Sequence, residues 1–302
     1  MKQTKRNLFK LLSASFLLSG LKINSAFANY QMLERIIPST KKSLPVIGLG
    51  TSRVFDIKPT TELLSIRQNI LDILLDNGGT LIDTSPMYGK SEEIIGRLIE
   101  TYDRKKEIFL ATKVWTKGKS EGENQIKESF RKMHTSKIQL IQIHNLLDWK
   151  TQITTLRKMK ESGEIEYIGI THSKADAFPA MEKIIVNEPI DFAQFNYSLG
   201  EREAENRLLP LCADQGVATI INRPFMRAKL FRSVKGKVLP SWCNDYGIGS
   251  WGQFFLKYIL SNPAVTNIIP ATSKPKNMLD NSLAGIGRIP DSKMKRKMLE
   301  VL

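Results

Sequence analysis

Four ionisable side chains stand at, or just beyond, the ends of three successive apolar runs of the chain. Asp83 ends the first run and Tyr88 follows it, Lys113 ends the second run, and His144 ends the third. A tyrosine with its ordinary pKa of about 10 is a weak acid, but a neighbouring ammonium stabilises the phenolate and lowers that pKa. If the four side chains converge, Lys113 can act on Tyr88 while Asp83 neutralises the lysine, and the group can transfer a proton.

Each of these residues, taken alone, has an ordinary structural explanation. Asp83 could cap a helix, Tyr88 could be a half-buried loop aromatic, and Lys113 could be a solvated charge. A single histidine such as His144 is also more often structural than catalytic. Their joint occurrence at three consecutive run ends indicates a common site, provided that the fold brings those ends together.

The apolar runs belong to a regular alternation of strand and helix patterns. Eight β-rich runs, most of them nearly continuous in Ile, Val, Leu and Phe, are typical of parallel strands buried on both faces. They cover residues 46–50, 80–83, 108–113, 138–144, 167–171, 191–196, 217–222 and 265–270. Segments with helical periodicity separate them, at residues 62–77, 91–100, 124–133, 149–162, 174–187, 201–215, 251–261 and 276–285.

This alternation indicates a parallel α/β fold, and the count of eight favours a single (β/α)8 TIM barrel over an open sheet. A barrel places the carboxyl ends of its strands around one mouth, where Asp83, Lys113 and His144 would meet. Residues 223–250 form a long loop after the seventh strand, and a loop of this length in a compact domain is usually functional or disordered. We expect one domain, residues 29–302, ending in a C-terminal helix.

The first 28 residues have the order of a signal peptide. Five Lys and Arg with no acidic residue surround an apolar stretch at residues 11–21, and Ala26-Phe27-Ala28 gives a small-x-small cleavage pattern. The stretch is too short to span a bilayer, which needs roughly 20 residues. An amphipathic N-terminal helix is the alternative. We expect export to the periplasm of a bacterium, or a cytoplasmic protein if the segment is not a functional signal.

Residues 4–10, Thr-Lys-Arg-Asn-Leu-Phe-Lys, resemble the twin-arginine export signal. Lys5 replaces the first arginine of that signal, and the Phe and Leu stand in reversed order, which leaves the ordinary secretion route open. The distinction matters because the twin-arginine route carries folded proteins, often with a cofactor already bound.

The charge of the chain suggests at first a nucleic-acid or membrane-surface partner. It has 45 Lys and Arg against 30 Asp and Glu, a net charge of +15, but five of these charges lie in the signal segment. The sequence has no nucleic-acid recognition motif, so we expect a small-molecule partner, no membrane span after signal removal, and a monomer. Cys212 and Cys243 can form one bridge at most, and no metal-ligand spacing is present.

Longer motifs around the four ionisable residues resemble those of the aldo-keto reductase family over most of the chain. They are Gly48–Thr51, Gly79–Gly89, Ala111–Trp115 and Ile141–Asn145. The resemblance implies a catalytic tetrad of Asp83, Tyr88, Lys113 and His144 that reduces an aldehyde or ketone to an alcohol. Hydride would come from a nicotinamide, because no side chain supplies one. Tyr88 would donate the proton, and His144 would position and polarise the carbonyl.

The resemblance also implies the residues that contact the nicotinamide. Thr171 and His172 stand where the family has a Ser-Asn pair at the carboxamide, and Gln194 matches a glutamine that contacts the same amide. Asn222 stands where the family often has an aromatic residue that stacks on the nicotinamide. This departure puts the stacking contact in doubt.

The phosphates and the adenine would lie against two further segments. Arg223 and Pro224 resemble the residues that approach the pyrophosphate. The segment after the eighth strand resembles the one that binds the adenosine phosphate and the adenine, through Thr272, Ser273, Lys274, Asp280 and Asn281. Asn277 replaces the usual arginine of the 2′-phosphate clamp, and Lys274 and Lys276 could substitute as charges. We expect NADP(H), with NAD(H) as the alternative.

Two expectations concern the substrate and the activity. Trp115, just past Lys113, would line the substrate mouth, with core packing as the alternative. The family also includes potassium-channel β-subunits, which bind the cofactor and act through a partner. The alternative function is therefore a cofactor-binding regulatory or sensor subunit with little turnover.

Overall fold

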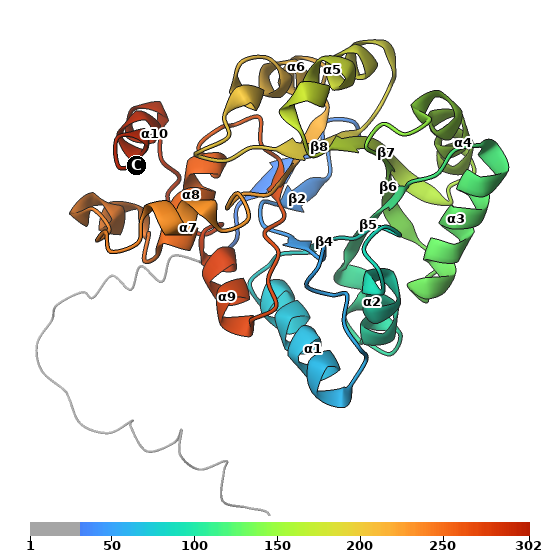
Figure 1. Ribbon diagram of the computed structural model, residues 1–302, viewed down its shortest axis with the longest axis horizontal. Coiled ribbons are helices and arrows are strands. Elements are labelled where there is room, and N and C mark those ends of the chain that lie inside the picture. The colour runs from blue at the N-terminus through green and yellow to red at the C-terminus, as the bar shows by residue number, and fades with distance from the viewer. Residues whose placement is uncertain (1–30) are drawn as a thin grey trace, which may run out of the picture. The chain divides into compact units, whose positions relative to one another are not determined.

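The computed structural model describes residues 31–302, and the predicted signal peptide lies outside these residues (Figure 1). Eight parallel strands form one sheet in the order of the chain. They are β3 (Leu49–Gly50), β4 (Leu81–Asp83), β5 (Phe109–Val114), β6 (Ile138–His144), β7 (Ile165–His172), β8 (Phe192–Asn196), β9 (Ala218–Asn222) and β10 (Asn267–Ile268). Parallel bridges from Ile47 to Ile268 and from Gly50 to Ala271 join the first strand to the last. The predicted (β/α)8 TIM barrel is confirmed.

Helices surround the barrel in the same alternation (Figure 1). Those between or after the strands are α1 (Thr61–Asp76), α2 (Ser91–Ile99), α3 (Lys119–Lys132), α4 (Trp149–Glu161), α5 (Phe178–Asn187), α6 (Leu208–Asp214), α8 (Trp251–Leu260) and α9 (Pro275–Leu283). The long loop after β9 contains α7 (Lys229–Ser233) and the 3-10 helix η4 (Ser241–Tyr246), and the predicted C-terminal helix is α10 (Ser292–Leu299). None of the helices between residues 31 and 302 has the length and apolar character that a membrane span needs.

Local sequence explains where the helices begin and end, as α1 illustrates. Thr60 caps its N-terminus by accepting a hydrogen bond from a first-turn N–H at 3.3 Å. Ile70 and Leu74, one helical turn apart, are buried in the core. The helix stops before Gly78, whose φ of +86° is one that glycine adopts without strain. The chain is thereby turned directly into β4, which carries Asp83.

An antiparallel hairpin that the sequence pattern does not predict precedes the barrel. Its strands, β1 (Glu34–Ile36) and β2 (Ser43–Pro45), have three residues each, too few for alternation to reveal. Ile37 and Leu44 of the hairpin belong to the apolar core that also contains Leu81, the first residue of β4. The hairpin therefore packs at the amino end of the barrel, opposite the strand ends that carry the ionisable residues.

The single helix expected over residues 201–215 is wrong in its extent. The 3-10 helix η3 (Glu203–Glu205) is followed by α6, which begins only at Leu208. The backbone of Arg207, between them, is not helical, with φ of −142° and ψ of −48°. Pro210 explains the break, because it lacks an N–H and its ring collides with the carbonyl of the residue four positions earlier in a continuous helix.

Candidate active site

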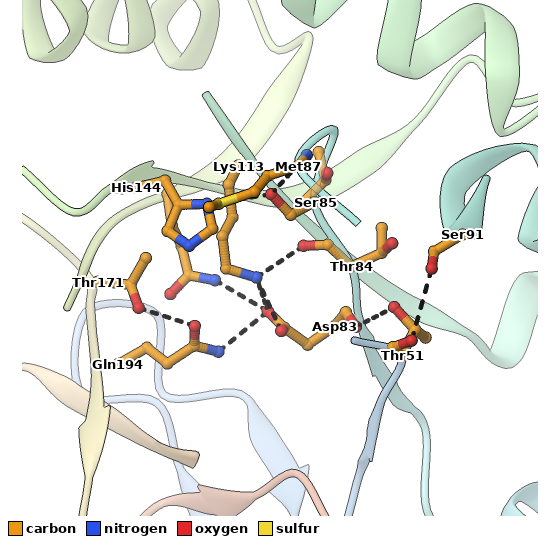
Figure 2. A network of polar contacts seen from close by, with 12 residues as sticks. Thr51, Asp83, Thr84, Ser85, Met87, Ser91, Lys113, His144, Thr171 and Gln194 are labelled. Carbon is orange, nitrogen blue, oxygen red and sulfur yellow. Dashed lines mark hydrogen bonds and ion pairs between the residues drawn. The ribbon is translucent and has the colours of Figure 1, made fainter. Parts of the chain in front are cut away.

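The ends of β4 and β5 bring Asp83 and Lys113 into direct contact (Figure 2). The Lys113 Nζ lies 2.8 Å from each Asp83 carboxylate oxygen and donates a further hydrogen bond, 2.6 Å long, to the Thr84 carbonyl. The lysine side chain has no exposed surface. Burial lowers the pKa of Lys113, but Asp83 and Tyr88 raise it by more, so that the net pKa is above the ordinary value. The side chain is therefore an ammonium.

Two glutamine side-chain amides also donate hydrogen bonds to the Asp83 carboxylate. Gln142 and Gln194 donate from Nε2 to the Asp83 Oδ1 at 3.2 and 3.0 Å, and the Thr171 hydroxyl donates to the Gln194 Oε1 at 2.8 Å. These contacts hold the carboxylate in one orientation, because each donor is itself fixed on a strand. Gln142 is not among the predicted residues. It lies two positions before His144 on β6, and the period of two that turns both side chains inward could have revealed it.

Tyr88 lies on the turn between β4 and α2, beside the lysine. The Lys113 Nζ is 5.0 Å from the centroid of the Tyr88 ring. The Ser91 hydroxyl fixes the turn by donating to the Tyr88 carbonyl at 2.8 Å. Burial raises the pKa of Tyr88 and Lys113 lowers it by less, so the net pKa is above the ordinary value. Lys113 thus acts on the pKa of Tyr88 in the predicted direction, but burial, which the sequence does not reveal, outweighs its effect.

His144 ends β6 with its ring edge-on to that of Tyr88, the two centroids being 5.9 Å apart. Its Nδ1 lies 3.1 Å from the Ser85 Oγ. Burial lowers the pKa of His144 to about 3, with smaller contributions from the charges of Lys113 and His172, so the imidazole is neutral near pH 7. When the Ser85 hydroxyl donates to Nδ1, the imidazole proton resides on Nε2, which can donate to a ligand.

A cavity of about 520 Å³ opens over these side chains at the carboxyl ends of the strands. The predicted site residues that line it are Asp83, Tyr88, His144, Thr171, Gln194, Asn222, Arg223 and Pro224. Lys113 lies behind this lining, in contact with Asp83. The structure therefore brings the four ionisable residues together with the positions predicted for the nicotinamide and the pyrophosphate.

The predicted adenosine segment follows β10 and lies outside the cavity lining. Its members are the buried Thr272, the exposed Ser273 and Lys274, and Asp280 and Asn281 on α9. The Asp280 carboxylate accepts hydrogen bonds from the Ser250 Oγ at 2.7 Å and from the Gln253 Nε2 at 2.8 Å. Asp280 thus fastens the start of α8 to α9, and its contact with adenine stays a prediction.

Trp115 and His172 stand near the strand ends but do not line the cavity. Trp115 is 40% exposed, and its ring centroid lies 6.5 Å from that of His144. His172, the last residue of β7, accepts the Lys174 N–H at 3.2 Å through Nδ1. The predicted contacts of Trp115 with substrate and of His172 with the nicotinamide stay predictions.

Part of the cavity wall comes from turns whose residues are not among the predicted site residues. These residues include Arg53, Asp56, Met87, Gly89, Asn145 and Arg227. The Asp56 Oδ1 accepts the Lys90 N–H at 3.0 Å, and a Cβ on residue 89 would lie 2.4 Å from the same oxygen. Only glycine fits at position 89, where φ is also +59°. Met87, Gly89 and Asn145 lie within the motifs quoted above, and Arg53 stands three residues past the end of the first predicted strand, so position near these strand ends is the signal that could have found them.

The remaining reactive side chains do not form a second centre. Cys212 and Cys243 are buried and free, and burial raises the pKa of their thiols to about 12 and about 11. Between residues 31 and 302, no group of His, Cys, Asp and Glu side chains could hold a metal ion. The chemistry of the described residues therefore centres on the barrel mouth.

Residues 46–297 match the aldo/keto reductase family. The chain belongs to that family. It is 28% identical over 201 residues to aldo-keto reductase YhdN of Bacillus subtilis (strain 168), a match that covers 61% of this chain and 59% of YhdN. It is 25% identical over 241 residues to methylglyoxal reductase YeaE of Escherichia coli (strain K12), covering 76% of this chain and 82% of YeaE. A crystal structure of an aldo-keto reductase from Klebsiella pneumoniae in complex with NADPH has the same fold, with a TM-score of 0.74 and 20% identity over 90% of this chain and 95% of that one.

Membership of the aldo/keto reductases places the chain in a class of NAD(P)H-dependent carbonyl reductases. The lining of the cavity suits such a cofactor. The Asn222 Oδ1 is buried without a hydrogen-bond partner, so it is available to a ligand donor such as a carboxamide N–H. Arg223 adds a cation for which a phosphate is a suitable partner. Asn222 is not aromatic, so it cannot stack on a ring, and its contact with a nicotinamide stays a prediction.

Proposed function

We propose that this aldo/keto reductase uses NADPH to reduce an aldehyde or ketone to an alcohol, with Tyr88 as the proton donor. The observation that carries the proposal is the fully buried Lys113 Nζ, which is 2.8 Å from both Asp83 carboxylate oxygens and 5.0 Å from the Tyr88 ring centroid. An ammonium held there stabilises the charge that develops on the tyrosine oxygen as its proton leaves. The nicotinamide, when bound, supplies a hydride to the carbonyl carbon.

His144 orients the substrate in this proposal. Its imidazole is neutral and its Nδ1 is engaged with the Ser85 Oγ, so Nε2–H is the donor left for the carbonyl oxygen. The carbonyl oxygen then lies between the Tyr88 hydroxyl and the His144 Nε2, and both hydrogen bonds polarise it. Asp83 contacts neither reactant, and its role is to hold Lys113 charged and in place.

The residues that would hold the cofactor lie at or after the carboxyl ends of successive strands. In chain order they would contact the nicotinamide, then the pyrophosphate and then the adenosine. Thr171, His172, Gln194 and Asn222 would contact the nicotinamide carboxamide, and Arg223 and Pro224 the pyrophosphate. Thr272, Ser273 and Lys274 would bind the adenosine phosphate, with Asp280 and Asn281 at the adenine. Lys274 and Lys276 are exposed cations near this end, which favours NADPH over NADH. The NADPH in the Klebsiella pneumoniae relative supports the same choice.

The proposed reduction is tested by following NADPH absorbance with a panel of small aldehydes and ketones. Methylglyoxal belongs in the panel because one relative is named for its reduction. We expect saturable turnover, faster with NADPH than with NADH. The alternative is a cofactor-binding subunit, which would bind NADPH saturably and leave its absorbance unchanged with every carbonyl. That result would exclude the enzyme function.

We also propose that the protein is exported and that residues 29–302 form a monomer. The support for export is the basic, apolar and small-x-small order of residues 1–28. Fractionation of cells that produce a tagged chain, followed by mass analysis of its N-terminus and light scattering, tests both statements. We expect a periplasmic monomer that begins at Asn29. A chain that keeps Met1 and stays in the cytoplasm contradicts the export proposal.

A further inference from the structure

Exposed lysines and arginines gather on two segments that are far apart in the sequence. Residues 229–238, which contain α7, have four cations and no acidic residue. Residues 286–302, which contain α10, have five cations and two acidic residues. We call the exposed cations of both segments the basic face, and its members are Lys229, Arg232, Lys235, Lys237, Arg288, Lys293, Arg296 and Lys297. The remaining cation, Lys295, pairs with Glu205 and is not a member.

Side-chain contacts place the two segments next to each other, on the side of the barrel where Figure 1 shows α7, α8 and α10. The Lys237 Nζ donates to the Val301 carbonyl, just past the end of α10, at 2.9 Å. The Lys297 Nζ on α10 lies 5.2 Å from the centroid of the Trp242 ring in η4, and that ring packs on α8. Phe231 of α7 packs on the same helix. The cations of the basic face therefore share one region of the surface.

The positive charge of the basic face has few counter-charges. None of its eight members forms an ion pair within residues 31–302. The acidic residues of the two segments and of the neighbouring η4 are three, namely Asp245, Asp291 and Glu300. Helix α3 shows the contrasting arrangement, in which cations pair with glutamates one helical turn away. Cations that are gathered without such partners attract an anionic surface.

Apolar side chains are exposed among these cations. Val238, directly after Lys237, is 88% exposed, and Phe231, directly before Arg232, is 39% exposed. The turn before Val238 is open to solvent, since a Cβ on Gly236 would have no atom within 4 Å. An aliphatic side chain gains free energy at the boundary between lipid headgroups and acyl chains, whereas the phosphate backbone of a nucleic acid offers it no apolar partner. The combination therefore fits an anionic bilayer better than a nucleic acid.

We propose that the basic face binds the surface of an anionic phospholipid bilayer, with Val238 entering the headgroup region. Attraction by several cations together with a small inserted apolar area holds a protein on a membrane without a spanning helix. The inference does not depend on the proposed reduction, since no member of the basic face lines the cavity. Arg227 and Ala228, directly before α7, do line it, so binding brings the mouth of the cavity close to the bilayer.

Co-sedimentation of the full chain with vesicles made of equal parts phosphatidylglycerol and phosphatidylcholine tests the proposal. A basic residue close to an anionic surface contributes about fivefold to binding. The triple variant Lys229→Gln, Arg232→Gln, Lys235→Gln should therefore bind these vesicles about 20-fold or more weakly than the wild-type chain. The double variant Lys293→Gln, Arg296→Gln makes the same test from α10 and should bind about fivefold or more weakly.

Lys127→Gln, Lys150→Gln, Lys158→Gln is the matched control for the triple variant. These three lysines are exposed on α3 and α4, which Figure 1 shows on the opposite side of the barrel, and they form no ion pair within residues 31–302. Their removal changes the net charge equally, but far from the proposed contact, so vesicle binding should weaken less than about threefold. The five cations of residues 1–28 are common to every chain and produce no difference between the variants.

An environment-sensitive dye at position 238 reports contact of the basic face itself. Labelled Val238→Cys should shift its emission to shorter wavelength when anionic vesicles are added, and high salt should reverse the shift by screening the attraction. Val186→Cys is the matched control, since Val186 is 57% exposed on α5 and its label should not respond. Cys212 and Cys243 are buried, so the dye is directed to the introduced thiol.

Two results overturn the inference. One is equal vesicle binding by the two triple variants together with unchanged emission from the label at position 238. The other is binding of a DNA duplex of about 20 base pairs that the Lys229, Arg232 and Lys235 substitutions abolish, while anionic vesicles are not bound. That result assigns the basic face to a nucleic acid instead of a bilayer.

Discussion

Asp83 determines the protonation of Lys113, its partner in a buried ion pair. Its carboxylate accepts hydrogen bonds from Lys113, Gln142 and Gln194, and it is buried. Removing one partner of a buried ion pair leaves an uncompensated charge, at a cost of about 3–5 kcal/mol. Lys113 therefore keeps its proton, and the exchangeable proton of the site is the one on Tyr88.

The pH dependence of reduction follows from the pKa values of His144 and Tyr88. His144 has a pKa of about 3 and stays neutral above pH 5, while Tyr88, with a pKa raised by burial, stays protonated to beyond its ordinary value. In the proposed mechanism the protonated phenol is the active form, so kcat/KM should be flat from about pH 5 to pH 8 and fall only as Tyr88 ionises. A pH–rate profile checks this. A transition near pH 6.5 that His144→Gln removes would contradict it.

At the scale of single residues, the sequence predicts the polar residues that end apolar runs. It does not predict which side chains contact them or how deeply they are buried. Asp83, Lys113 and His144 are visible because each is a charged or polar residue at the end of an apolar strand. Gln142 is less visible, since a glutamine inside such a run has no motif of its own. The net pKa of Tyr88 does not follow from the sequence, because it depends on burial, which long-range packing sets.

The helix that follows the Tyr88 turn is α2, and the packing of α2 depends on Gly96. A Cβ on Gly96 would lie 2.0 Å from the Lys132 carbonyl oxygen, at the end of α3. The two helices approach so closely that no larger residue fits without a backbone shift. Because α2 begins directly after the tyrosine turn, this contact also fixes the turn relative to β5 and Lys113.

Gly96→Ala should destabilise the protein by about 1–3 kcal/mol, because the added methyl group collides with backbone that cannot rotate away. The measurement is the free energy of unfolding in urea. Gly249→Ala is the matched control, since φ there is not positive and the nearest atom to an added Cβ is 3.7 Å away. Equal stability of the two variants would show that α2 and α3 can separate without cost.

At the scale of elements, the sequence predicts all eight barrel strands, but it does not predict the short hairpin of β1 and β2 or the short helix α7. Buried parallel strands such as Ile138–His144 appear as continuous apolar runs, so their number and order follow from the sequence. The hairpin of β1 and β2 is stabilised by the barrel core rather than by its own pattern. The long loop after β9 contains α7, a helix of five residues, which is too short to leave a periodic signal.

At the scale of the whole molecule, the C-terminal helix is fastened to the barrel by a cluster around Glu205. The Lys295 Nζ on α10 lies 2.8 Å from the Glu205 Oε1, which also accepts the Tyr258 hydroxyl of α8 at 3.0 Å and that of Tyr197. The same ammonium lies 5.2 Å from the centroid of the Tyr258 ring. These contacts join the last helix to two segments that are distant in the sequence.

Lys295→Met should lower the free energy of unfolding by about 1–3 kcal/mol, because it leaves the partly buried Glu205 without its cation. Urea unfolding measures the loss, and limited proteolysis should release α10 sooner than in the wild-type protein. Lys293→Met is the control, since Lys293 is exposed on the same helix and forms no ion pair among the described residues. Identical behaviour of both variants would contradict the role given to Lys295.

The proposed reduction depends on Tyr88 as the proton donor. The most direct measurement is NADPH oxidation by an aldehyde substrate in the wild-type protein and in Tyr88→Phe, with the Kd for NADPH determined for both. We predict that the variant loses turnover by about 10²-fold or more, because the acid is removed while the cavity keeps its shape, and that it binds NADPH as before. Reduction at an unchanged rate by Tyr88→Phe would contradict the mechanism.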